Sequence, residues 1–452
     1  MLKGMSVAAT TLGCKVNQAE TDSMLDMLKA AGANIVEFDE KADIYIVNTC
    51  SVTNIADKKS RQMLHRARKM NPDGIVIAAG CYVQSAREIL EQDEAIDIVI
   101  SNNKKKSITE IVNDYINVRN NGKNAPGKDH EAMEYFVDIS RETEYEEMGG
   151  HVPVGHTRAY VKIQDGCNQF CSYCIIPYVR GRIRSRSQEA ILAEVSELAE
   201  AGIKEVVLTG IHISSYGKDK NNGGALIELI EAISKIKGIK RIRLGSLEPG
   251  IITEEFVERI SSNSKVCPHF HLSLQSGCDS VLKRMNRKYT CKQYFEKCDM
   301  LRKAYKSPAL TTDVIVGFPG ETEEEFAETV RYLTELNLYE MHIFKYSPRK
   351  GTVAAAMKEQ VAPEIKNERS DVLLKLAHDN KTAYEAQFEG CELEVLVEEV
   401  VKKDNKTYLR GHTERYMDIL IDVGDISMPE SFVNSFVYVT YTQNGGNLPL
   451  LL

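Results

Sequence analysis

Three cysteines lie close together near the middle of the chain. Cys167, Cys171 and Cys174 form a CxxxCxxC pattern directly after the short stretch 160–163, which reads as a strand. Three thiols at this spacing can wrap one metal centre, and they cannot be three independent core positions of one element. A structural zinc site would need four closed ligands, and no fourth Cys or His stands nearby in the sequence. An iron–sulfur cluster on three thiolates would keep one iron open for a substrate or cofactor.

Three further cysteines, Cys14, Cys50 and Cys81, each follow a predicted strand. These strands cover residues 7–12, 43–49 and 75–80, and helical stretches such as 20–31 separate them. Strands that alternate with helices imply a parallel sheet, whose binding sites form at the carboxyl edge of the strands. We therefore expect the three thiols to converge there. The alternative is that each is a small buried residue at a tight turn, because free cysteine packs well in cores.

The chain has eleven cysteines, and the remaining five match no ligand spacing. In a reducing cytosol cysteines are better explained by metal binding or catalysis than by disulfides. We predict that the five are packing residues: Cys267, Cys278, Cys291, Cys298 and Cys391.

Length and composition indicate a folded chain of several domains. The 452 residues correspond to about three domains, and 43% hydrophobic and 27% charged residues exclude disordered and fibrous classes. A net charge of −8 argues against a surface coated in basic residues, although a local basic patch could still bind RNA. No apolar run is long enough to span a bilayer and no secretory signal is apparent, so we expect a cytoplasmic protein.

The elements that must position the cysteines form three modules in an α/β chain. We predict an N-terminal parallel α/β domain over 1–118, a polar linker over 119–155, a partial (β/α) barrel over 156–381 and a small antiparallel β-barrel over 384–452. The barrel strands are expected at 160–163, 205–208, 241–244, 269–274, 312–316 and 339–344. The last module is expected to have strands at 392–397, 418–421 and 436–441.

The CxxxCxxC loop at the start of a (β/α) barrel resembles the radical S-adenosylmethionine superfamily. Within it, the chain resembles the methylthiotransferases along essentially its whole length. The motifs that carry this resemblance are Gly13-Cys14-Lys15-Val16-Asn17, Asn48-Thr49-Cys50, Gly80-Cys81, Cys174-Ile175-Ile176-Pro177, Leu208-Thr209-Gly210, residues 271–277 and residues 313–322. The C-terminal module stands where that family carries a TRAM domain.

The resemblance implies two 4Fe–4S clusters and two roles for S-adenosylmethionine, as methyl donor and as source of a 5′-deoxyadenosyl radical. Cys167, Cys171 and Cys174 would hold the radical-generating cluster, and Cys14, Cys50 and Cys81 the cluster that carries sulfur. The first-cysteine motif and the loop Thr209-Gly210-Ile211-His212 look like the branch that methylthiolates C2 of N6-threonylcarbamoyladenosine at position 37 of tRNA. An electron donor and a sulfur source are implied partners.

The resemblance also suggests residues that contact S-adenosylmethionine. The candidates are Tyr173, Thr209, Gly210, Ser246, Glu248, Gln275, Val316 and Phe344. Contacts to tRNA phosphates are expected from Arg180, Arg182, Arg184 and Arg186, which share one face if the segment is extended. The resemblance implies that the TRAM-like module binds tRNA, but the charge of this module does not suit phosphate binding. Residues 384–441 hold twelve acidic residues and five Lys or Arg.

Three alternatives stay open at this stage. The same chemistry could act on isopentenyladenosine in tRNA or on a ribosomal protein side chain. A non-enzyme alternative is an RNA-binding protein in which zinc or iron only stabilises the fold. A brown, oxygen-sensitive protein that cleaves S-adenosylmethionine would exclude the last.

Overall fold

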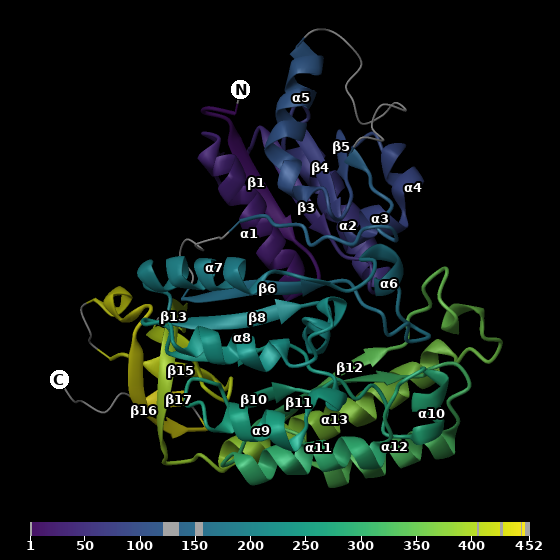
Figure 1. The fold of residues 1–452 in the computed structure, drawn as a ribbon, viewed down its shortest axis with the longest axis vertical. Coiled ribbons are helices and arrows are strands. Elements are labelled where there is room, and N and C mark those ends of the chain that lie inside the picture. Colours follow the sequence, from purple (N-terminus) through teal and green to yellow (C-terminus); the bar gives the residue numbers. More distant parts are fainter. Residues whose placement is uncertain are drawn as a thin grey trace.

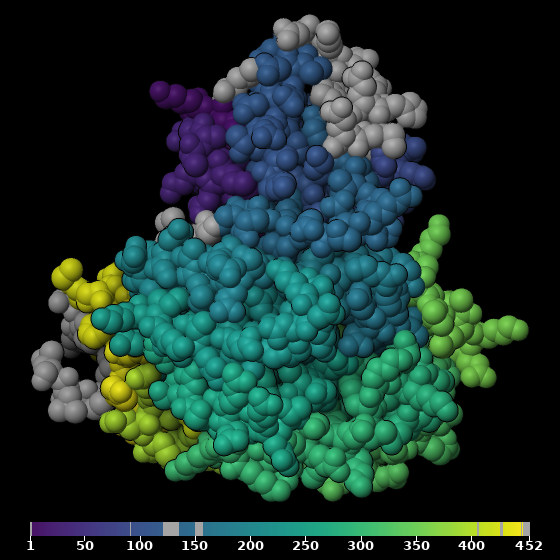
Figure 2. Space-filling model, viewed as in Figure 1, coloured from purple at the N-terminus to yellow at the C-terminus, as the bar shows by residue number. Residues whose placement is uncertain are grey.

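The computed structural model describes residues 2–120, 135–149, 157–404, 406–424, 428–443 and 445–447. An N-terminal α/β body stands above a central arc of parallel strands, and a small β-barrel packs beside that arc (Figure 1). Figure 2 shows the same three parts in contact, with the N-terminal body seated on the central one. Within the described residues, no helix combines the length and the apolar character needed to cross a membrane.

The N-terminal body is a five-stranded parallel sheet in the order β2-β1-β3-β4-β5. Its strands are β1 (Ser6–Thr11), β2 (Asn34–Ile35), β3 (Ile44–Thr49), β4 (Ile75–Gly80) and β5 (Ile98–Ile100). Its helices are α1 (Lys15–Ala30), α2 (Asn54–Met70), α3 (Cys81–Ser85), α4 (Arg87–Glu91) and α5 (Ile108–Asn120). β3 and β4 are buried along their whole length, as their apolar, mostly β-branched residues require when helices cover both faces of a parallel sheet.

The central body contains the six predicted strands in two hydrogen-bonded sets, β6-β8-β9 and β10-β11-β12. They are β6 (Arg158–Asp165), β8 (Glu205–Gly210), β9 (Arg241–Leu244), β10 (His269–His271), β11 (Ala309–Val316) and β12 (Glu340–Lys345). Two isolated parallel bridges join the second half to the first, Ile242 with Val266 and Leu247 with Leu272. A short strand, β7 (Arg184–Ser185), pairs antiparallel with β6.

Helices cover the outside of this arc, which is the partial (β/α) barrel that the alternation of elements predicts (Figure 1). They are α7 (Gln188–Glu200), α8 (Ala225–Ser234), α9 (Glu254–Ser261), α10 (Asp279–Arg284), α11 (Cys291–Ala304), α12 (Glu323–Leu336) and α13 (Pro363–Ala386). The short helix α6 (Ile176–Val179) lies instead against α3 of the N-terminal body. α11 and α12 begin with capping boxes, at Thr290 and at Thr322.

The C-terminal body is a closed barrel with the strand order β13-β14-β15-β17-β16. Its strands are β13 (Glu392–Lys403), β14 (Lys406–Thr413), β15 (Asp418–Asp422), β16 (Phe436–Thr442) and β17 (Gly445–Asn447). All pairs are antiparallel except β15 with β17. Arg241 and Arg243 of β9 attach it to the central body by donating to the backbone oxygens of His412, Thr413 and Glu414.

The predicted linker 119–155 is described only in part, because residues 121–134 and 150–156 lie outside the described residues. Residues 135–149 pack against both neighbouring bodies. Tyr135 belongs to the core of the N-terminal body, and the Tyr145 hydroxyl donates to the Lys162 backbone oxygen of β6 at 3.0 Å. This segment therefore connects the first two bodies through contacts rather than as a free tether.

Candidate active site

The first group of thiols converges because β1, β3 and β4 are neighbours in the sheet. Cys14 and Cys50 come after the last residues of β1 and β3, and Cys81 begins α3 directly after β4. Gly13 has a φ of +106°, and a Cβ there would lie 2.8 Å from the Cys50 Sγ. A glycine is required at this point both by its backbone conformation and by the nearby sulfur.

Desolvation and the neighbouring thiols raise the pKa values of Cys50 and Cys14. Burial raises the pKa of Cys50 to about 12, and the thiols of Cys81 and Cys14 add to this shift. Cys14 has an exposed surface, yet desolvation by the surrounding protein also raises its thiol pKa. Thiols with raised pKa values suit a cationic centre, because a bound metal removes the cost of the thiolate charges.

The second group lies on the loop that follows β6. Burial raises the pKa of Cys167 to about 11 and that of Cys174 to about 12, and the Cys171 thiol contributes to both shifts. The segment after α10 holds this loop in place: Asn286 donates to the Phe170 backbone oxygen at 2.9 Å, and the backbone N–H of Ser172 donates to the Met285 oxygen at 3.0 Å. Residues more than 110 positions away in sequence thus fix the CxxxCxxC loop.

One guanidinium donates to a sulfur in each group. Arg180 Nε is 3.2 Å from Cys81 Sγ, and Arg287 Nη1 is 3.2 Å from Cys171 Sγ. Both arginines are polar partners for sulfurs that carry negative charge when they bind iron. No ligand-like pattern in the sequence marks Arg287, because its contact with Cys171 exists only in the fold.

The donor sets fit iron–sulfur clusters better than single ions. Among the described residues, the one set of three His, Cys, Asp or Glu side chains whose ligand atoms all lie within 4.8 Å of one another is His271, Asp313 and His342. Neither cysteine group meets this limit, so each group leaves more room than one zinc ion needs. Three sulfurs with a wider spacing and one cationic hydrogen-bond donor suit a cluster of several irons.

A cavity of about 300 Å³ lies beside Cys174 of the second group. Val52 and Thr53, from the loop after Cys50, form one wall, and Tyr173 and Cys174 of the CxxxCxxC loop form another. The ends of the second half of the barrel complete it with Gln275, Asp313, Ile315 and residues 344–347. The loop that follows Cys50 and the loop that carries the second group therefore line the same space.

The predicted S-adenosylmethionine contacts divide into two sets. Tyr173, Gln275 and Phe344 line the cavity, and Gln275 adopts a positive φ of 75°. Thr209 and Gly210 end β8, whereas Ser246 is exposed and the Val316 side chain is in the core.

Glu248 accepts a 2.9 Å hydrogen bond from Gln169 of the cysteine loop and lies 3.4 Å from His212. Burial alone would raise the pKa of Glu248, but its interaction with His212 holds this pKa below its usual value.

The four predicted RNA-binding arginines do not share one exposed face. Arg180, Arg184 and Arg186 are buried, and each lies beside carboxylates of the protein itself. The reason is that the segment is not extended throughout: α6 ends at Val179, and β7 contains only Arg184 and Ser185. Arg182 alone is exposed, with its guanidinium 4.4 Å from the Phe170 ring.

Buried ion pairs join the N-terminal body to the barrel beside the first thiol group. Glu20 of α1 pairs with Lys162 of β6 at 2.7 Å and also with Arg180 and Lys105. Arg180 continues this network to Asp165 at 3.1 Å. Burial alone would raise the pKa of Glu20, but Arg180, Lys105 and Lys162 hold it well below its usual value of 4.5.

A second contact joins the same two bodies at the loop after Cys50. Arg349, in the loop after β12, donates to Asp57 at 2.6 Å, to Asn54 at 2.7 Å and to Ser51 at 2.8 Å. The two wall-forming residues Val52 and Thr53 lie between these partners in the sequence. Arg349 thus holds the loop after Cys50 against the barrel.

The fold and the site together define a radical S-adenosylmethionine enzyme with a second cysteine centre. The family model described as "Radical SAM superfamily" matches residues 161–333, and the one described as "Uncharacterized protein family UPF0004" matches residues 6–101. Among solved structures, the radical S-adenosylmethionine methyltransferase TsrM from Kitasatospora setae has a similar fold, with a TM-score of 0.53 and 15% identity over 76% of this chain and 77% of that one.

Curated relatives identify the family. The chain is 39% identical to the threonylcarbamoyladenosine tRNA methylthiotransferase MtaB of Bacillus subtilis, over 92% of this chain and 90% of the relative. It is 38% identical to MtaB of Aquifex aeolicus, over 92% and 98%. It is also 35% identical to the tRNA-2-methylthio-N(6)-dimethylallyladenosine synthase of Thermoanaerobacter pseudethanolicus, over 96% and 90%. The chain belongs to the radical S-adenosylmethionine methylthiotransferase family, whose members use S-adenosylmethionine and 4Fe–4S clusters.

Proposed function

We propose that this enzyme adds a methylthio group to C2 of N6-threonylcarbamoyladenosine at position 37 of tRNA. The observation that carries the proposal is a cavity lined both by Cys174 and by the loop that follows Cys50, because a transfer of sulfur to an activated carbon needs both centres close to one substrate atom. The names of the MtaB relatives support this substrate. The dimethylallyladenosine relatives have similar identity, so the alternative tRNA is included in the test.

The cysteines have two different roles in this proposal. Cys167, Cys171 and Cys174 hold the cluster beside which S-adenosylmethionine binds, and Cys14, Cys50 and Cys81 hold the auxiliary cluster. When bound, the first supplies reductive cleavage of S-adenosylmethionine and the second supplies sulfur. A radical is required because no side chain of ordinary pKa can remove the C2 proton of an adenine ring.

Other residues of the chain bind and orient the reactants. Tyr173, Gln275 and Phe344 contact S-adenosylmethionine from the cavity wall. Thr209, Gly210, Ser246, Glu248 and Val316 stay predicted contacts of the same cofactor. Arg182 is the one predicted RNA contact that we retain, because its guanidinium is exposed beside the cysteine loop.

The proposal includes partners and a location. An electron donor and a sulfur source must serve the enzyme, and a tRNA substrate favours a cytoplasmic location. The division of the chain at residues 118, 155 and 381–384 also stays a prediction.

The test is an anaerobic reaction followed by mass spectrometry of the nucleosides. Reconstituted protein, reductant, S-adenosylmethionine and sulfide are incubated with tRNA that carries threonylcarbamoyladenosine or, in parallel, dimethylallyladenosine. We expect a methylthio product from the first tRNA, its complete loss in Cys14→Ala and Cys171→Ala, and its retention in Cys391→Ala, the matched control at an exposed cysteine. Product only from the second tRNA would contradict the proposed substrate. Product from Cys14→Ala would contradict the proposed role of the first thiol group.

A further inference from the structure

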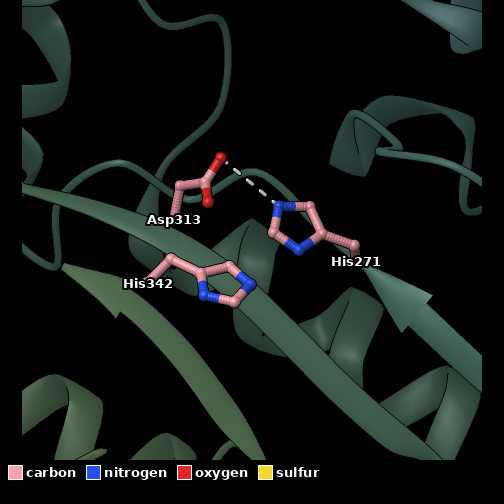
Figure 3. A group of neighbouring side chains, drawn as sticks. All are labelled: His271, Asp313 and His342. Carbon is pink, nitrogen blue, oxygen red and sulfur yellow. Dashed lines mark ion pairs between the residues drawn. The ribbon is translucent and has the colours of Figure 1, made fainter. Parts of the chain in front are cut away.

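Two histidines and an aspartate form a polar cluster on three neighbouring strands. His271 ends β10, Asp313 lies on β11 and His342 lies on β12. His271 is in register with Thr311, and Asp313 is in register with His342. Because alternate residues of a strand face the same side, all three side chains point from one face of the sheet. Figure 3 shows them directed toward one another.

The cluster keeps hydrogen-bonding capacity that the protein does not use. His271 Nδ1 is 3.0 Å from Thr311 Oγ1, which orients the ring and directs Nε2 toward Asp313. This Nε2 is buried without a hydrogen bond, and the nearest Asp313 oxygen is 3.4 Å away. The His342 ring is exposed and stacks on that of His271, with 5.8 Å between ring centres. Buried polar atoms without partners are uncommon and call for an explanation.

Asp313 connects the cluster to the cavity that Cys174 and the loop after Cys50 line. It lines that cavity together with Gln275 and Phe344. An N6 substituent of an adenine that enters this cavity would meet Asp313, with the two imidazoles on the same face of the sheet.

The chemistry of this polar cluster fits one of the two candidate substituents. A threonylcarbamoyl group carries urea N–H groups, a hydroxyl and a carboxylate, whereas a dimethylallyl group is a hydrocarbon. Asp313 can accept from an N–H or hydroxyl, and the imidazoles can donate to a hydroxyl or carboxylate. A hydrocarbon would cover the same polar atoms without satisfying them, which costs binding energy.

We propose that His271, Asp313 and His342 bind the polar N6 substituent of the substrate adenine and thereby select threonylcarbamoyladenosine over dimethylallyladenosine. This inference rests on the proposed function and assigns its substrate choice to specific side chains. Sites built to hydrogen-bond a substrate group discriminate strongly against analogues that lack the group.

The experiment measures RNA binding by the holoenzyme without reductant, so that no turnover occurs. Labelled anticodon stem–loops carry threonylcarbamoyladenosine or dimethylallyladenosine at position 37, and fluorescence anisotropy gives a dissociation constant for each. We expect the wild type to prefer the first RNA by about tenfold or more. In His342→Leu and Asp313→Asn the ratio of the two constants should fall close to one. His65→Leu, at an exposed histidine of α2, is the matched control and should keep the preference.

The possible results separate the two proposals. A preference that persists in both His342→Leu and Asp313→Asn overturns this inference and leaves the proposed function standing. A wild type without any preference, combined with no product from threonylcarbamoyladenosine tRNA, overturns both. Metal analysis tests the alternative that His271, Asp313 and His342 bind a divalent cation. One divalent ion per chain beyond the iron of the iron–sulfur clusters, lost in His342→Leu, would show such a cation site and overturn the inference.

Discussion

At the scale of single residues, the hydrogen bonds to cysteine sulfurs have a measurable consequence. Arg287 donates to Cys171 and is anchored by the Tyr289 hydroxyl at 2.8 Å. A cationic donor stabilises the more negative, reduced form of a cluster and thereby raises its reduction potential.

We therefore expect Arg287→Met to lower the midpoint potential of the radical-generating cluster by about 60 mV, a tenfold change in a one-electron equilibrium. An EPR-monitored redox titration measures this potential, and Arg287→Lys should retain part of it. Arg284→Met is the control, because Arg284 pairs with Glu325 and donates to no cysteine. An unchanged potential in Arg287→Met would show that the donor does not tune the cluster.

At the scale of elements, the turns that end β1 and β4 determine whether the first thiol group can form. Gly13→Ala places a Cβ against Cys50 and forces an L-residue into a positive φ, at a cost of roughly 1–2 kcal/mol before the clash is counted. We expect this variant to lose the auxiliary cluster, with its iron content close to half that of the wild type. Iron and sulfide analysis of the purified protein measures the loss. Gly250→Ala, where an added Cβ meets nothing within 4 Å, should keep full iron content.

Some of the elements that form the site could be predicted from the sequence, and others could not. The strands that carry Cys14, Cys50 and Cys81 were predictable because their apolar runs end at the cysteines, and a parallel sheet then brings those ends together. The arginine segment 180–186 was not, because its conformation depends on Glu20, Asp165 and Glu147, which only the tertiary structure brings to it. The polar cluster at His342 was not predictable for a similar reason: its members lie on three strands and have no common spacing.

At the scale of the whole molecule, the buried network around Glu20 joins the two bodies that carry the thiol groups. Glu20→Gln leaves the charges of Arg180, Lys105 and Lys162 without one of their partners in a buried site. Breaking such a network costs about 3–5 kcal/mol. We expect the N-terminal body to unfold at a lower temperature in this variant, measured by calorimetry, and to become sensitive to limited proteolysis. Glu110→Gln, at an exposed position of α5, should behave like the wild type.

This network also gives the interface a predictable dependence on pH. The pKa values of Glu20 and Asp165 are lowered by their cationic partners against the effect of burial. A carboxyl with a lowered pKa in the folded state stabilises that state above its unfolded pKa and loses this contribution as the pH falls. The wild type should therefore lose stability as the pH drops below about 4.5, and Glu20→Gln should lose less over the same range. Thermal unfolding measured between pH 3 and 7 tests this, and equal slopes for the two proteins would contradict it.

The attachments at Arg180 and Arg349 have one more consequence. They hold the N-terminal body to the barrel near a cavity of about 300 Å³, which is too small for a folded RNA loop. If these attachments persist when RNA binds, the two bodies do not separate to admit the loop. The nucleotide must instead leave the base stack of the anticodon loop and enter alone, so the energy of unstacking is paid by the RNA. Anticodon loops in which that nucleotide is already poorly stacked should react fastest.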